Sequence, residues 1–171
     1  YEALEHLDNS SYFKASNGFY HGVIDASGRI IVPIEYDYIG RMREDIIVAR
    51  KDGVYGCFDK SGRNIVPFEY QEIKEYVGGM ARICEKGRYG FIDKDGEKIV
   101  SPYYDAVENF SEGCAKVVAK GKAGFVKLNQ DSGSVKEEWV VFPMYEAAGS
   151  FSCGLAPLCQ GGKYGFINKS G

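Results

Sequence analysis

A two-residue step, in which an aromatic residue, a histidine or, once, an alanine precedes a glycine, returns along this chain at nearly constant intervals. The glycines of these steps are Gly22, Gly56, Gly90, Gly124 and Gly165. Successive glycines are 34 (56−22), 34 (90−56), 34 (124−90) and 41 (165−124) residues apart. Self-similarity at such a period indicates units that bury their apolar faces only by stacking on their neighbours. The chain is therefore expected to be a tandem array of about five units.

Composition and charge narrow the classes of partner. With 171 residues, of which 44% are apolar and 14% aromatic, the chain can bury a core of ordinary domain size. Its formal net charge of −3, from 21 basic and 24 acidic residues, gives no electrostatic footprint for nucleic acid or anionic lipid. No window reaches 18 consecutive apolar residues. We expect no nucleic-acid partner and no membrane span.

Each unit begins with a predicted β-hairpin. In the clearest unit, the apolar pairs Phe91-Ile92 and Ile99-Val100 are separated by the turn Asp93-Lys94-Asp95-Gly96. Aspartate favours the first position of a type I turn and glycine the last. The apolar residues are adjacent rather than alternating, which predicts strands covered on both faces.

Proline and tyrosine follow the hairpin at regular places. The prolines, Pro33, Pro67, Pro102 and Pro143, are expected to end the second strand, because proline cannot donate to a β-ladder. A tyrosine follows each of them, at Tyr36, Tyr70, Tyr104 and Tyr145. A further apolar strand then leads to the next glycine step, which predicts three short strands per unit.

The repeat glycine itself lies inside a predicted strand. A glycine there costs conformational entropy and normally marks a bulge or a close approach of another backbone. A neighbouring aromatic ring can cover the bare backbone. We therefore expect Tyr55, Tyr89 and Tyr164 to pack over the glycines that follow them.

The unit from Arg88 to Asp105, of the form Arg-Tyr-Gly-Phe-Ile-Asp-x-x-Gly-x-x-Ile-Val-x-Pro-x-Tyr-Asp, resembles the WG (KWG) repeats of bacterial proteins. The resemblance extends from about Tyr12 to Gly171. The family is defined by its repeats, and the resemblance brings no catalytic residues with it. This chain has His21, Tyr55, Tyr89, Ala123 or Tyr164 where the family often has tryptophan.

Together these patterns predict one all-β repeat domain over residues 1–171, stacked as an open, curved superhelix. A small β-propeller is the alternative, although propeller blades usually have four strands in a longer repeat. The predicted units are 1–19 (partial), 20–53, 54–87, 88–121, 122–162 (with an insertion) and 163–171 (partial). Because it lacks an initiator methionine, the chain reads as a piece of a longer protein.

Residues capable of catalysis or metal binding are sparse. Both histidines lie in the first 21 residues, no nucleophile or phosphate-loop motif accompanies them, and there is no Cys-x-x-Cys pair among the five cysteines. Asp93 and Asp95 precede a glycine as in a calcium loop, but a strand resumes before further ligands could follow. We expect no enzyme activity, no cofactor and no metal, and we expect most of the cysteines to serve as core residues.

The irregular fourth unit is the most informative about function. Its seven extra residues (41−34) fall between Val126 and Val140, so its hairpin is lengthened and its tip should project. The one tryptophan, Trp139, lies at the base of this hairpin, either as strand packing or as an anchor for a partner. We predict a non-catalytic scaffold that binds an unknown protein or peptide; the alternative is a carbohydrate or cell-wall module. The candidate interaction residues are Trp139, Tyr36, Tyr70, Tyr104 and Tyr145.

Overall fold

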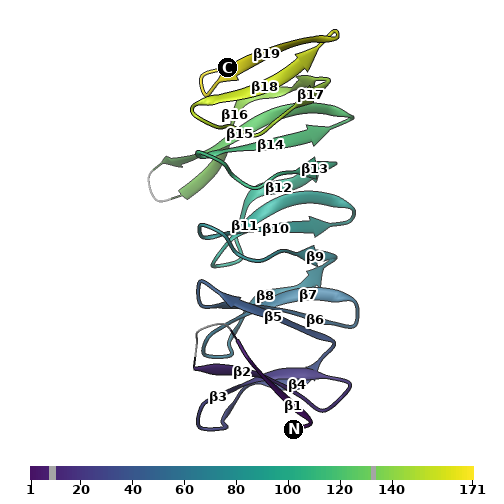
Figure 1. The fold of residues 1–171 in the computed structure, drawn as a ribbon, viewed down its shortest axis with the longest axis vertical. Helices are drawn as coiled ribbons and strands as arrows, with labels where there is room; N and C mark the ends of the chain where they lie inside the picture. The colour runs from purple at the N-terminus through teal and green to yellow at the C-terminus, as the bar shows by residue number, and fades with distance from the viewer. Residues whose placement is uncertain (8–10, 132–133) are drawn as a thin grey trace. The chain divides into compact units, whose positions relative to one another are not determined.

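The computed structural model describes residues 1–7, 11–131 and 134–171, and the side chains of these residues except 130, 131 and 134–136. Within this part of the chain all regular structure is β-strand, and the strands form small sheets that follow one another along the sequence (Figure 1). None of these sheets closes into a barrel. The prediction of an all-β repeat chain is confirmed.

The described residues fall into two compact units, residues 1–86 with 92–97 and residues 87–91 with 98–171. The first sheet contains β1 (Ala3–His6), β2 (Tyr12–Ser16), β3 (His21–Asp25) and β4 (Ile30–Tyr36). The second contains β5 (Tyr38–Arg43), β6 (Ile46–Lys51), β7 (Val54–Asp59) and β8 (Asn64–Tyr70). The third contains β9 (Glu72–Ile73), β10 (Met80–Glu85), β11 (Arg88–Asp93) and β12 (Lys98–Tyr104).

The fourth sheet contains β13 (Ala106–Val107), β14 (Cys114–Ala119), β15 (Lys122–Asp131) and β16 (Ser134–Tyr145). The fifth contains β17 (Ala147–Ala148), β18 (Leu155–Gln160) and β19 (Lys163–Asn168). In chain order we call the four strands of a sheet the short, middle, glycine and proline strands. The repeat units are thus small sheets of three or four strands, because a short strand lies between each proline strand and the next middle strand.

The turn between glycine and proline strands forms as predicted. The N–H of Gly28 donates to the carbonyl oxygen of Asp25 at 2.9 Å, and the N–H of Gly62 donates to that of Asp59 at 3.0 Å. The Asp25 carboxylate also accepts hydrogen bonds from the backbone N–H groups of Ser27 and Arg29, at 2.9 and 3.0 Å. One aspartate therefore satisfies several donors of the turn, which explains its fixed position in the sequence.

The repeat glycine faces a bulge in the proline strand. In the second sheet, Tyr55 pairs with Tyr70 but Cys57 pairs with Val66, so two residues of β7 oppose four of β8. The same shift separates the pairs His21 with Tyr36 and Val23 with Val32. The prediction that proline ends the strand is wrong: the strand continues to the tyrosine. Proline is tolerated because the bulge leaves its position without a ladder hydrogen bond to donate.

The predicted close approach at the glycine is present. A Cβ at Gly90 would lie 2.3 Å from the carbonyl oxygen of Val100, and one at Gly56 would lie 2.8 Å from that of Val66. Gly22 and Gly124 approach the same carbonyl of their own proline strands, at 2.6 and 2.7 Å. Such distances exclude any side chain without a shift of the backbone.

A ring from the proline strand covers the glycine of the second sheet. The atom nearest to a Cβ at Gly56 is Cδ2 of Phe68, at 2.7 Å, so the covering ring comes from the proline strand. Tyr55 is the preceding residue of β7, and successive side chains of a strand point to opposite faces. Packing of Tyr55 over the glycine that follows it stays a prediction.

The core lies on both faces of the strands. The side chains of Ile46, Ile47, Val48 and Ala49 are consecutive in β6, and all four are buried. Residues 46 and 48 belong to one apolar cluster, whereas 47 and 49 belong to another. Adjacent apolar residues thus fill the spaces on either side of a sheet, as the sequence predicts.

Candidate interaction surface

The lengthened hairpin keeps the register of the ordinary ones. In β15 and β16, Ala123 pairs with Tyr145 and Phe125 with Val141, which reproduces the bulge of the other hairpins. Pairing then continues without a further shift from Val126 opposite Trp139 to Asp131 opposite Ser134. The seven extra residues therefore extend the hairpin at its outer end. The predicted projecting tip, residues 132–133, lies outside the described residues.

Trp139 packs against two other rings. Its indole makes an edge contact with the Tyr104 ring, with centroids 5.9 Å apart and planes at 76°. It lies 4.7 Å from the Phe142 ring at a tilt of 32°. The indole is half-buried in this arrangement. The strand-packing role of Trp139 is thus present, while its role as an anchor stays a prediction.

The tyrosines predicted to interact with a partner lie mostly in the core. Tyr36, Tyr70 and Tyr104 are buried, and Tyr145 is half-buried. The ring of Tyr36 stacks on Phe68 at 5.3 Å and contacts Phe58 edge-on at 5.3 Å. A binding role for these four residues stays a prediction.

Tyr104 connects the extra hairpin to the preceding proline strand. Its hydroxyl donates a hydrogen bond to the carboxylate of Glu137, a residue of β16. Burial raises the pKa of the Tyr104 phenol, and the Glu137 carboxylate raises it further. The phenol is therefore a protonated donor at neutral pH, which fixes the base of the hairpin against β12.

Exposed apolar side chains flank Trp139 on β16. Phe142 is 63% exposed and Met144 is 50% exposed, and the half-buried Val141 and Pro143 alternate with them. We call Trp139, Phe142 and Met144 the β16 patch. An ion pair of Lys127 with Glu138, at 3.3 Å, lies on the same hairpin.

The signal for this patch is present in the sequence but is easily missed. By the observed strand register, Phe142 occupies the place of Pro67, and Met144 occupies the place of Glu69. A charged residue at an exposed position has thus been replaced by an apolar one. An alignment that superposes the prolines of the repeats hides this difference. Pro143 lies one residue later in its strand than Pro67, so such an alignment shifts Phe142 and Met144 by one position.

The five cysteines differ in how deeply they are buried. Cys57, Cys84 and Cys114 are buried, and burial raises the pKa of the Cys57 thiol to about 12. Cys153 is exposed and Cys159 is half-buried. Among the described residues, no group of three or more His, Cys, Asp or Glu side chains is placed to hold a metal ion.

Comparison with known proteins identifies the repeat. The family described as "WG containing repeat" matches residues 22–55, 55–89, 89–122 and 135–164. The chain belongs to the WG repeat family. The match resumes at residue 135, so the WG unit that holds β15 and β16 is interrupted where the hairpin is lengthened. A repeat family of this kind indicates a scaffold.

A search of curated proteins found no match to this WG repeat chain. Among solved structures, the chain is similar to one described as Kluyveromyces lactis Hsv2 complete loop 6CD, with a TM-score of 0.47 and 12% identity. The alignment covers 97% of this chain and 58% of the yeast chain. In the described residues, no helix is long and apolar enough to cross a membrane.

Proposed function

We propose that this WG repeat chain is a non-catalytic scaffold that binds another protein or a peptide, and that the β16 patch is its contact surface. The observation that carries the proposal is the exposure of Phe142 and Met144 at places where the second sheet has Pro67 and Glu69. Water contact with such side chains is unfavourable, and a partner that covers them removes this cost.

The composition of the patch is typical of the centre of a protein interface. Full burial of a phenylalanine or methionine side chain contributes about 1.5–3 kcal/mol. Aromatic residues and methionine are enriched in such interfaces, and tryptophan is prominent among the residues that dominate binding. The ring of Trp139 packs against the ring of Phe142, with centroids 4.7 Å apart, and this contact limits the motion of the exposed Phe142 ring.

A carbohydrate partner is the alternative. Sugars stack on the open face of an aromatic ring, whereas the indole of Trp139 has Phe142 beside one face and Tyr104 along its edge. Phe142 offers a single exposed ring. These contacts favour a protein or peptide.

The test compares Phe142→Ala with Phe19→Ala, which removes an even more exposed phenylalanine, 87% exposed, from the turn before β3. Proteins retained by the wild-type chain from extracts of its natural host would be identified, and the strongest would be purified for calorimetric titration. We expect Phe142→Ala to weaken binding at least tenfold and Phe19→Ala to leave it unchanged. Equal binding by both variants would refute the role of the patch, and selective retention of a glycan on an array would favour the alternative.

A further inference from the structure

The second sheet carries large side chains across a row that three other sheets fill mostly with small ones. Tyr38 of β5 pairs with Arg50 of β6, and Arg50 pairs with Tyr55 of β7. The corresponding rows are Ala3, Ser16 and His21 in the first sheet, Ala106, Val118 and Ala123 in the fourth, and Ala147, Cys159 and Tyr164 in the fifth. The repeat therefore folds without a tyrosine at the place of Tyr38 or an arginine at the place of Arg50.

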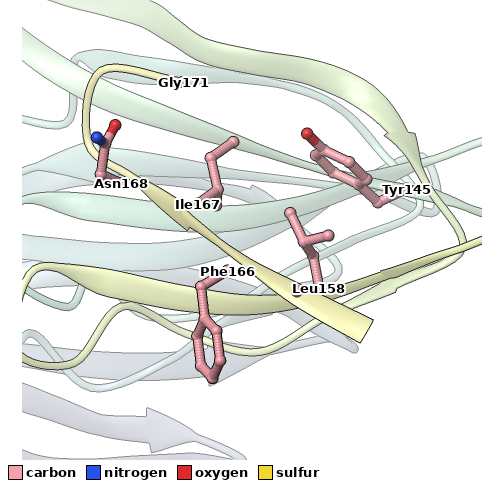
Figure 2. A pocket seen from close by; sticks show the side chains of 7 residues that line it. Tyr145, Leu158, Phe166, Ile167, Asn168 and Gly171 are labelled. Carbon is pink, nitrogen blue, oxygen red and sulfur yellow. The ribbon is translucent and has the colours of Figure 1, made fainter. Parts of the chain in front are cut away.

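The Tyr38 side chain is positioned by the backbone of its own strand. A Cβ at Gly40 would lie 3.3 Å from the Tyr38 hydroxyl oxygen and 3.4 Å from its Cε1, so the ring lies along β5 over this glycine. Successive side chains of a strand point to opposite faces, as Figure 2 shows for Phe166 and Ile167 of β19. Ile39 belongs to the buried cluster on the other face, whereas Tyr38 is 44% exposed. The phenol ring is thus held in place and accessible to a ligand.

A cavity of about 320 Å³ lies beside this ring, within the first compact unit. We call it the Tyr38 cavity. Tyr38 and Tyr55 contribute aromatic rings to its lining, and Val48 and Ile73 contribute buried apolar side chains. Small-molecule sites have volumes of about 300–1,000 Å³, so this cavity has room for a small ligand or one unit of a larger one.

The charged residues that line the Tyr38 cavity balance one another. Arg41 and Lys74 are basic, and Glu72 and Glu75 are acidic. Lys74 forms an ion pair with Glu72, and the Glu75 carboxylate lies 3.4 Å from Nε of Arg43. An anion or a cation therefore gains little net attraction from this lining. The same four side chains offer hydrogen-bond donors and acceptors close together, which suits a neutral ligand whose hydroxyl groups both donate and accept.

We propose that the Tyr38 cavity binds a neutral sugar unit of a glycan. The apolar face of the sugar ring packs on Tyr38, and its hydroxyl groups form hydrogen bonds with Arg41 and Glu75. Tyr55 forms part of the wall, and the guanidinium of Arg50 packs on its ring, with Cζ 5.9 Å from the ring centroid. The cavity shares no residue with the β16 patch, and its ligand is of a different class from the protein or peptide proposed for that patch.

The test follows the backbone amide NMR signals of the wild-type chain during titration with maltose, cellobiose and N,N′-diacetylchitobiose, all of them neutral. We expect at least one of these sugars to shift the Gly40 and Arg41 signals saturably at millimolar concentrations. Acetate at the same concentrations should not reverse the shifts. The absence of a saturable shift with all three sugars would overturn the proposal, and so would displacement of the sugar by acetate, which would show that the cavity binds an anion.

Tyr38→Ala is the decisive variant, because three other sheets have alanine at this place and we therefore expect a nearly unchanged melting temperature. Sugar binding should weaken at least tenfold, since the packing surface is removed. Tyr103→Ala, which removes a 75% exposed tyrosine from β12, and Phe142→Ala should both bind normally. Full binding by Tyr38→Ala, or loss of binding in Phe142→Ala alone, would refute this site. The signal shifts of the wild-type chain decide the matter even if Tyr38→Ala unfolds.

Discussion

Gly62 lies directly against the carbonyl oxygen of Ile31, and a Cβ at this glycine would lie 2.0 Å from that oxygen. Gly62 ends the hairpin turn of the second sheet, whereas Ile31 lies in the proline strand of the first. The same contact joins Gly96 to Ile65 and Gly171 to Val140, with the Cβ position 3.0 Å from the oxygen in each. The interval is 31 residues in all three pairs (62−31, 96−65, 171−140). A turn of one sheet thus rests on the preceding sheet through a glycine.

The contact between Gly62 and Ile31 can be measured with a matched pair of variants. Gly28 and Gly62 end the same type of turn with φ of +85° and +87°, but nothing lies within 4 Å of a Cβ at Gly28. Gly28→Ala should cost about 1–2 kcal/mol, from the left-handed backbone alone. Gly62→Ala should cost a further 1–3 kcal/mol, from the collision. Urea unfolding of both variants checks this, and equal losses would show that the contact adjusts freely.

Gly90→Val should be among the most damaging single substitutions. Its Cβ would lie 2.3 Å from the carbonyl oxygen of Val100, so the hairpin must open or shift, at a cost of about 2–4 kcal/mol. Thermal unfolding is the measurement. Gly165→Val is the control, because a Cβ there meets only Leu158 at 3.8 Å, and it should melt close to the wild type. If Gly90→Val melted at the wild-type temperature, close packing would not be the reason for a glycine at this position.

The Asp25 turn should make stability sensitive to acid. The hydrogen bond from the Ser27 hydroxyl lowers the pKa of the Asp25 carboxyl from 3.8 to about 2, and the backbone N–H of Arg29 contributes to the same shift. Because the folded-state pKa is depressed, this stabilisation is present above pH 4 and is lost as the pH falls towards 2.

We expect Asp25→Asn to reduce the loss of unfolding free energy between pH 4 and pH 2, measured by urea titrations at several pH values. Asp95→Asn is the control, since Asp95 donates its N–H to the Asp93 carboxylate rather than accepting the hydrogen bonds of the turn. Identical acid profiles for the wild type and Asp25→Asn would contradict the assignment.

Trimming the lengthened hairpin should cost little beyond one hydrogen bond. Replacement of residues 129–138 by a tight Asp-x-x-Gly turn changes loop closure by only about 0.6 kcal/mol per doubling of length. The Tyr104 hydroxyl loses its Glu137 partner, however, and an unsatisfied buried hydroxyl costs about 1–3 kcal/mol. Tyr104→Phe should therefore destabilise the full chain but not the trimmed one, as a double-mutant cycle by denaturant unfolding would show. Equal effects in both backgrounds would deny the coupling.

The period and the turns of this fold are readable from the sequence because they depend on local chemistry. An aspartate that caps a turn and a glycine with positive φ have the same neighbours in the first three hairpins, so they recur there at fixed places. The short strand is different. Glu72–Ile73 has only two residues, and its pairing with Ile83 and Cys84 is decided by the rest of the sheet.

Two further features could not be predicted from the sequence. These are the continuation of strands past proline and the residue whose ring lies over Gly56. Proline generally ends a strand, but at Pro67 the strand continues because of the bulge opposite Gly56. Phe68 covers that glycine from twelve residues away (68−56), across a strand pairing that no local pattern specifies. The exposure of Phe142 likewise follows from the bulge register rather than from the residue types around it.

In the lengthened hairpin, the length of the outer part is independent of the strand pairing at the base. Tyr145 returns to the same pairing as its shorter relatives after seven additional residues, so the outer part of a hairpin can vary in length and content while the stacked base stays the same. The outer part of such a hairpin can therefore change in evolution without a change in the sheets that carry it. An engineer could use the same freedom to graft foreign loops between Val126 and Val140, one unit at a time.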